Sequence, residues 1–197
     1  IKQTSLPREV EEKLDGIAKI ARENNCRSHI DGARIFNASI SSSLSPKRMA
    51  REYDSISVCL SKGLGAPVGS VLVGSAETLY KAHRWRKMFG GGMRQAGVLA
   101  AAGIYSLENN VHRLSEDHHR AMEIATAVER MDSYEVDLEQ VQTNMVYVKC
   151  DQGGAESLIH RLEKLGIQAL TIDSSTIRMV THLHITDDDV QRTILSL

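Results

Sequence analysis

The chain has 197 residues, of which 42% are hydrophobic, with 24 basic and 25 acidic side chains. A chain of this size and composition can bury a core as one large domain or as two small ones. The net charge of -1 gives no reason to expect a nucleic-acid partner or binding to a membrane surface. The longest apolar run, 96–105, contains two glycines and is too short to span a bilayer.

The three cysteines, Cys26, Cys59 and Cys150, are scattered and share no spacing that is typical of metal ligands. Their odd number argues against a disulfide framework, so we predict free thiols in a reducing, cytoplasmic compartment and no metal site. The first residue is Ile1, and no signal-peptide pattern precedes the first helix. We expect the chain to start inside a longer gene product or after a processing event.

The first predicted element is a helix that Ser5 and Pro7 open and that Asn24 ends, because capping residues and proline favour a first turn. Its apolar residues recur at spacings of three and four, which predicts one buried helical face. These residues are Val10, Leu14, Ile17, Ala18 and Ala21.

Three strands are predicted in the first half of the chain. A segment over 27–30 runs into the turn residue Asp31, so that an acid stands at the carboxyl end of a strand. The β-prone runs 55–60 and 70–73 predict two more strands. The segment 61–67 between them is rich in glycine and proline, which predicts a loop.

The second half of the chain predicts helices followed by a smaller domain. A glycine run marks a loop, long helices follow it, and strands then alternate with helices, as in an α/β domain. The predicted segments are the loop 90–92, one or two helices over 94–130, strands over 144–149 and 176–181, a helix over 155–165 and a closing helix from Asp187.

Lys62 is the first candidate for chemistry. A lone lysine in a loop is ordinarily a solvated side chain, but the surrounding loop contains three glycines, one proline and no other charge. An amine presented from such a loop suits nucleophilic catalysis. The glycines do not match a dinucleotide-binding fingerprint, because the third falls one place late and a strand follows where a helix is required.

Asp31 is the second candidate, because open α/β sheets bind ligands outside the carboxyl ends of their strands. An acid and an amine at two strand ends suit an aldehyde cofactor that needs a Schiff-base amine and a partner for a pyridinium nitrogen. Taken alone, an Asp-Gly pair is more simply a turn.

Four segments resemble a known family in the family's own order. They are HIDGAR at 29–34, DSISVCLSKGLGAPVGSVLVGS at 54–75, WRKMFGGGMRQAG at 85–97 and IRMVTH at 177–182. Together they resemble the low-specificity L-threonine aldolases, which are pyridoxal-phosphate enzymes of fold type I, the aspartate-aminotransferase-like class. The resemblance implies an α/β fold, with the remainder of a cofactor-binding large domain over 1–110 and a small C-terminal α/β domain over 111–197.

The resemblance also implies roles for single residues. Lys62 would form the Schiff base with pyridoxal 5'-phosphate, and Asp31 would pair with its pyridinium nitrogen. Arg34 and Arg178 would hold the carboxylate of an amino-acid substrate, with Arg34 also near the cofactor. Two guanidinium forks suit a planar carboxylate better than lysine would.

Lys87 and Arg94 match basic positions of the family that reach a neighbouring subunit's site near the cofactor phosphate. The resemblance therefore implies a homo-oligomer, dimer or tetramer, with shared active sites. The implied reaction is retro-aldol cleavage of L-threonine or L-allo-threonine to glycine and acetaldehyde, in threonine catabolism and glycine biosynthesis.

Two alternatives remain open. One is another pyridoxal-phosphate lyase, of the β-eliminating kind, which would share the lysine and the aspartate. The other is a truncated or non-catalytic chain. The family has an N-terminal part with a ring that stacks on the cofactor and a Gly-Thr turn around its phosphate, and this chain begins after both. We therefore expect an incomplete site in the chain taken alone.

The histidines are weaker candidates. We expect His29 to be structural rather than a base. His182 and His184 are predicted to share one face of a strand, as a metal-binding pair would, but no third ligand has a convincing spacing. Packing and hydrogen bonding are therefore the expected roles of this pair.

Overall fold

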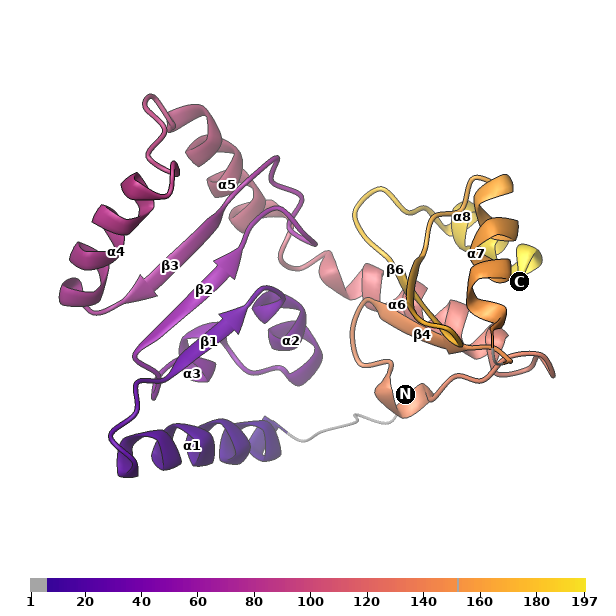
Figure 1. Cartoon of the computed structure of the whole chain (residues 1–197), viewed down its shortest axis with the longest axis horizontal. Coiled ribbons are helices and arrows are strands. Elements are labelled where there is room, and N and C mark those ends of the chain that lie inside the picture. The colour runs from indigo at the N-terminus through magenta and orange to yellow at the C-terminus, as the bar shows by residue number, and fades with distance from the viewer. Residues whose placement is uncertain (1–6, 152) are drawn as a thin grey trace. The chain divides into compact units, whose positions relative to one another are not determined.

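The computed structural model describes residues 7–151 and 153–197, and the chain divides into two compact units, Ile1–His112 and Arg113–Leu197 (Figure 1). This division lies two residues after the boundary expected at 110. Within the two described ranges, none of the helices combines the length and the apolar character that crossing a bilayer requires.

Unit 1 contains a three-stranded sheet in the order β1-β2-β3 (Figure 1). β1 and β2 are parallel, joined through two short helices, whereas β2 and β3 are antiparallel and joined by a loop. The elements of this unit are α1 (Pro7–Glu23), β1 (His29–Gly32), α2 (Ile35–Ser42), α3 (Pro46–Met49), β2 (Ser55–Cys59), β3 (Ser70–Gly74), α4 (Ala76–Met88) and α5 (Gly97–Asn109).

The core of unit 1 lies on one face of β1 and β2. Ile56 of β2 packs with Ile35, Leu44 and Met49, and the partly buried Ile30 of β1 joins them. Because successive side chains of a strand point to opposite faces, the other face carries the remaining residues of both strands. Those residues are His29, Asp31, Ser55, Ser57 and Cys59, and none of them is fully buried.

Several predictions for unit 1 are confirmed. α1 ends where expected, although Ser5 lies outside the described residues, and β2 and β3 match the predicted strands to within one residue. β1 begins two residues later than predicted and includes Asp31. α2, α3 and α4 were not predicted. Ser45 and Ser75 cap α3 and α4 through their side chains, and these caps were the signals available in the sequence.

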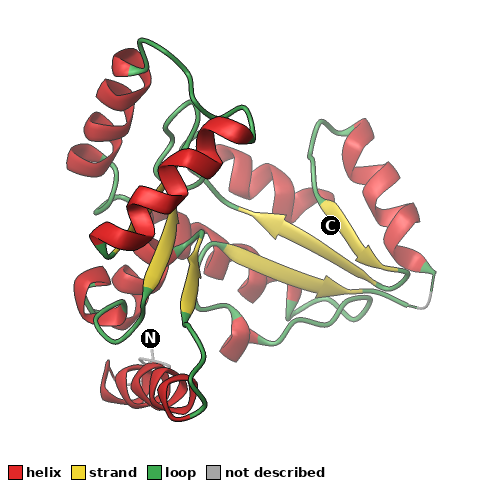
Figure 2. Cartoon of the chain, turned by 60° about the vertical axis from the view of Figure 1, so that its left-hand side comes forward, coloured by secondary structure: helices red, strands yellow, loops and turns green. Residues whose placement is uncertain are grey.

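Unit 2 is an antiparallel three-stranded sheet in the order β4-β6-β5, with helices packed on one face (Figure 2). Its core combines side chains of α6, α7 and α8 with the inward residues of β4 and β6, such as Val146 and Ile177. The elements are α6 (Leu114–Val128), a 3-10 turn (Leu138–Gln140), β4 (Met145–Lys149), α7 (Gly154–Lys164), β5 (Leu170–Asp173), β6 (Thr176–Val180) and α8 (Asp187–Ser196).

The helices and two of the strands of unit 2 agree with the sequence predictions, but β5 was missed. All four residues of β5 are exposed, so the strand lacks the alternation of buried and exposed positions that reveals a strand in sequence. The extra strand changes the topology, because the hairpin of β5 and β6 makes every pairing in this sheet antiparallel.

Candidate functional site

Asp31 and Lys62 lie at the same edge of the sheet of unit 1. β1 and β2 run parallel, and Asp31 is in register with Ser57. Lys62 follows three residues after the end of β2 at Cys59. The carboxyl ends of both strands therefore open on one side, which is where open sheets place their ligand sites.

The loop that carries Lys62 is closed by backbone hydrogen bonds. The N–H of Gly65 donates to the carbonyl of Lys62 at 2.9 Å, and the N–H of Ala66 donates to the carbonyl of Leu60 at 3.0 Å. Gly65 has a φ of 72°, a left-handed conformation that glycine adopts without strain. Leu64 and Ala66 are buried. The loop therefore turns its apolar side chains inward and leaves the Lys62 side chain exposed.

Helix α5 and the residue that follows it contact this loop. The side-chain amide of Asn110, directly after α5, donates to the carbonyl of Leu64 at 2.7 Å. Gly103 of α5 faces Leu60, whose Cδ1 would lie 3.1 Å from a Cβ at this position. Asn110 was not among the residues predicted from the sequence. The signal available was a polar residue at the end of an apolar helix, and such a residue more often serves as a cap.

Asp31 has one carboxylate oxygen engaged and one open. Its Oδ1 accepts a hydrogen bond from the N–H of Ala33 at 3.1 Å, which fixes the turn after β1. Oδ2 has no hydrogen-bond partner within the described ranges. The next residue is Gly32, where an added Cβ would lie 2.6 Å from the carbonyl oxygen of Ser57. Glycine is therefore required for β1 to approach β2 beside Asp31.

His29 lies on the same face as Asp31. Its Nδ1 is 2.8 Å from the hydroxyl of Ser55, and its Nε2 is 3.3 Å from the hydroxyl of Ser57. Both ring nitrogens thus contact β2, in agreement with a structural role for this histidine.

Arg34 begins the segment that passes beside the Lys62 loop. Arg34 and Ala33 line a hollow of about 10 Å³ together with Cys59 and Gly63. This volume holds about one water molecule, so the hollow is not a ligand pocket. It shows only that the segment after β1 lies next to the Lys62 loop. Burial raises the pKa of Cys59, but hydrogen bonds from Ser61 and Ser70 and the charge of Lys62 outweigh it, and the net effect is a lowered pKa.

Arg178 belongs to unit 2. It lies on β6, between Tyr147 of β4 and Leu170 of β5 in the strand register. Its Nε atom is buried and has no hydrogen-bond partner among the described residues. A buried donor without a partner is costly, so this guanidinium has capacity for an anion.

Lys87 and Arg94 lie at either side of the glycine turn between α4 and α5 and are exposed. Neither side chain forms a hydrogen bond or an ion pair with another residue in the described part of the chain. Gly92 lies against the Lys87 side chain, because a Cβ added at Gly92 would be 2.5 Å from the Cδ atom of Lys87. The structure does not bring these two basic residues into contact with Asp31 or Lys62.

The prediction that His182 and His184 share a strand is wrong. β6 ends at Val180, and both histidines lie in the loop that follows it. The backbone N–H of His184 donates to Nδ1 of His182 at 3.3 Å, and the two rings meet edge to face. Among the residues that the structure describes, no three histidine, cysteine or acidic side chains cluster as metal ligands would.

The residues at the edge of unit 1 fit the donor set that an aldehyde cofactor with a pyridine ring requires. Lys62 offers a primary amine that is engaged in no ion pair with the described residues, and Asp31 offers an open carboxylate oxygen. Both come from the carboxyl ends of adjacent parallel strands. The edge therefore presents an amine and a carboxylate from two adjacent parallel strands.

Comparison with known proteins identifies the family of the chain. The family model of the beta-eliminating lyases matches residues 10–151. The chain belongs to the beta-eliminating lyase family. It is similar to low-specificity L-threonine aldolase 1 of Arabidopsis thaliana, with 43% identity over 186 residues, 93% of this chain and 52% of that protein. It is likewise 43% identical to the low specificity L-threonine aldolase of Escherichia coli over 185 residues, 94% of this chain and 53% of that protein.

The fold of this family member matches solved structures as well. A threonine aldolase of Leishmania major superposes with a TM-score of 0.76 at 17% identity, covering 94% of this chain and 55% of that chain. The α/β, fold-type I architecture expected from the sequence is thereby confirmed. The chain spans about half the length of the curated relatives that it matches.

Proposed function

We propose that the full-length protein is a pyridoxal-phosphate-dependent aldehyde-lyase that cleaves L-threonine and L-allo-threonine to glycine and acetaldehyde. The observation that carries the proposal is the parallel pairing of β1 and β2, which brings Asp31 and Lys62 to one sheet edge. The similarity to low-specificity L-threonine aldolases supports the substrate class.

In this proposal Lys62 holds the cofactor covalently through its amine, and Asp31 holds the proton on the ring nitrogen through its open oxygen. The bound cofactor supplies an electron sink for the carbanion that cleavage of a Cα–Cβ bond leaves behind. The turn that Ala33 closes on Asp31 and the closed loop around Lys62 keep both groups oriented. Orientation of this kind lowers a barrier by removing entropy before the reaction.

Arg34 and Arg178 are the proposed partners of the substrate carboxylate. For Arg178, the support is its buried Nε atom without a partner among the described residues. For Arg34, the support is its place beside the Lys62 loop, because Arg34 lines the same small hollow as Gly63, the residue after Lys62. A guanidinium binds a carboxylate with two parallel hydrogen bonds, which also fixes the orientation of the substrate.

Lys87 and Arg94 are proposed to act in a neighbouring subunit of a homo-oligomer, near the cofactor phosphate. The support is their exposure and their lack of ion pairs with the described residues of their own chain. An exposed cation of this kind is available to an anion that another subunit holds.

The decisive test is the covalent label. The full-length protein is incubated with pyridoxal phosphate, reduced with borohydride and mapped by peptide mass spectrometry. We expect the pyridoxyl mass on the peptide containing Lys62, and its loss in Lys62→Ala. Lys47→Ala is the matched control, because Lys47 is also an exposed lysine of unit 1. A label elsewhere, or one that survives in Lys62→Ala, would contradict the assignment.

The match to the beta-eliminating lyase model makes β-elimination a second candidate activity. Acetaldehyde release from threonine and pyruvate release from a β-substituted amino acid are therefore measured on the same preparation. We expect the first and not the second. In Asp31→Asn the cofactor should stay attached to Lys62 while turnover falls, because a neutral amide cannot hold the ring proton. Full activity in a folded Asp31→Asn protein would leave Asp31 only a turn residue.

A further inference from the structure

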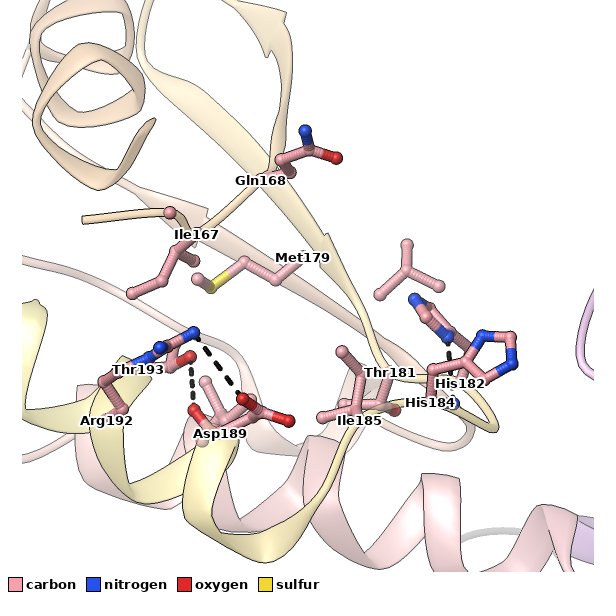
Figure 3. A pocket seen from close by; sticks show the side chains of 13 residues that line it. Ile167, Gln168, Met179, Thr181, His182, His184, Ile185, Asp189, Arg192 and Thr193 are labelled. Atoms are coloured by element: carbon pink, nitrogen blue, oxygen red, sulfur yellow. Dashed lines mark hydrogen bonds and ion pairs between the residues drawn. The ribbon is translucent and has the colours of Figure 1, made fainter. Parts of the chain in front are cut away.

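Unit 2 contains a cavity that the proposed reaction does not use. Its volume is about 340 Å³, and it lies between α8, the end of β6 and the segment before β5 (Figure 3). This is within the range of small-molecule sites, near its lower end. Figure 3 shows Ile167 and Met179 on one side of the space and Asp189, Arg192 and Thr193 on the other.

The cavity is separate from the proposed substrate arginine. Ile177 and Met179 of β6 are buried against the helices, whereas Arg178 between them points to the other face of the sheet. Met179 lines the cavity and Arg178 does not. The two sites therefore lie back to back on one strand.

The charged side of the cavity carries one anion and one cation, both incompletely engaged. Oδ2 of Asp189 accepts hydrogen bonds from the N–H and the hydroxyl of Thr186, at 3.0 and 2.7 Å, as part of the cap of α8. The first of these bonds is the main reason why the pKa of Asp189 is below its usual value, so the carboxylate is ionised at neutral pH.

Arg192 reaches Oδ1 of Asp189 only at 3.5 Å. A charge-assisted hydrogen bond measures about 2.7–2.9 Å, so this contact is a loose pair. The guanidinium has five N–H donors, and in the described residues this loose contact is the only ion pair that it forms. Both groups can therefore accept a further partner of opposite charge.

The opposite side of the cavity carries aliphatic side chains, next to the polar Gln168. Ile124, Ile167 and Met179 are almost completely buried, and Ile185 is partly buried against the same core. These four side chains offer an aliphatic wall beside the charged pair. A ligand that matches the cavity therefore has a positive group, a negative group and a branched aliphatic tail within a small volume.

We propose that this cavity binds a free α-amino acid with an aliphatic side chain of about the size of leucine. The ammonium group is bound by Asp189, the carboxylate by Arg192, and the side chain lies against Ile124, Ile167 and Met179.

The experiment is a titration of the full-length protein, labelled with ¹³C in its methionine methyl groups, with L-leucine. We expect a saturable shift of the Met179 signal with a dissociation constant of about 0.1–1 mM, as suits a ligand of this size. Glycine, which lacks the aliphatic tail, should bind about tenfold or more weakly. 4-Methylpentanoate lacks the ammonium group and 3-methylbutylamine lacks the carboxylate, and each should bind at least about tenfold more weakly than leucine.

Variants separate this site from the proposed substrate site. Arg192→Gln and Asp189→Asn should each weaken leucine binding by about tenfold or more, and the asparagine oxygen can still accept the hydrogen bonds that cap α8. Asp188→Asn and Lys164→Gln are the matched controls, because neither residue lines the cavity, and both should bind as the parent protein does. Arg178→Ala should also leave leucine binding unchanged.

Three outcomes would overturn the proposal. One is the absence of a saturable Met179 shift with leucine. Another is equal binding of leucine and 4-methylpentanoate, which would leave Asp189 without a role as the partner of the ammonium group. The third is loss of leucine binding in Arg178→Ala but not in Arg192→Gln, which would assign the leucine to the substrate site. None of these results bears on whether threonine is cleaved.

Discussion

Gly32→Ala tests the close approach of β1 and β2 on which the candidate site depends. An added Cβ would lie 2.6 Å from the carbonyl oxygen of Ser57, whereas ordinary contacts begin at 3.4 Å, a shortfall of 0.8 Å. The nearest atom belongs to backbone that is hydrogen-bonded within the sheet, so it cannot rotate away. Forcing an extra methyl group into such a space costs about 1–3 kcal/mol.

Gly16→Ala provides the matched control. Gly16 lies inside α1, and an added Cβ would meet no other atom within 4 Å. The same chemical change should there stabilise unit 1 by about 0.5–1 kcal/mol, because glycine inside a helix is less favourable than alanine. The two variants should thus differ by about 1.5–4 kcal/mol in the free energy of opening this unit.

Hydrogen exchange followed by mass spectrometry resolves the effect to the strand pair. We expect the amides of peptides spanning 29–59 to exchange about 10-fold to several-hundred-fold faster in Gly32→Ala than in Gly16→Ala. Peptides of unit 2 serve as an internal reference. Equal exchange rates of the β1 and β2 amides in the two variants would show that the close contact at Gly32 does not restrict the side chain there.

Three further outcomes are expected. Asp117→Ala should destabilise unit 2 by about 3–5 kcal/mol in chemical unfolding, because it leaves the 14%-exposed Arg113 guanidinium without its bidentate carboxylate. The backbone hydrogen bond from Ser28 is the main reason why the pKa of Asp54 is lowered in the folded protein. Asp54 therefore stabilises the fold above the pKa that it has in the unfolded chain, and this stabilisation is lost as the pH falls through its pKa in the folded protein. Asp54→Asn should therefore flatten the loss of unit 1 stability below about pH 4, and an unchanged acid profile would contradict this. Arg178→Ala should lower kcat/KM for threonine roughly 10- to 150-fold, mainly through KM, as expected for a lost charged hydrogen bond of about 1.5–3 kcal/mol, and a change below about threefold would argue against substrate contact.

Much of the local structure follows from short-range patterns in the sequence. α1 repeats apolar residues at helical spacing, and glycine and proline rule out a helix around Lys62. These features depend on neighbouring residues, which set backbone preferences regardless of the remainder of the fold. The position of Lys62 after a strand could therefore be predicted, and so could that of Asp31 near the end of one.

The tertiary structure decided how these local pieces meet. The parallel register of β1 and β2 brings Asp31 and Lys62 to one edge, and Asn110 holds the lysine loop from 46 residues away. The exposed strand β5 has no alternating pattern, yet its pairing with β6 makes the sheet of unit 2 antiparallel. Contacts of this kind depend on backbone groups and side chains that are remote in sequence, and nothing in a local window reports them.

The same reason explains why the cavity of unit 2 was not predicted. Asp189 and Arg192 are ordinary charged residues of an exposed helix in the sequence, and Met179 is an ordinary core residue of a strand. Only the packing of α8 beside β6 makes them face one space. Residue identity determined which groups were available for binding. Packing over long sequence separations determined which of them came together, because burial and close approach are properties of the folded chain.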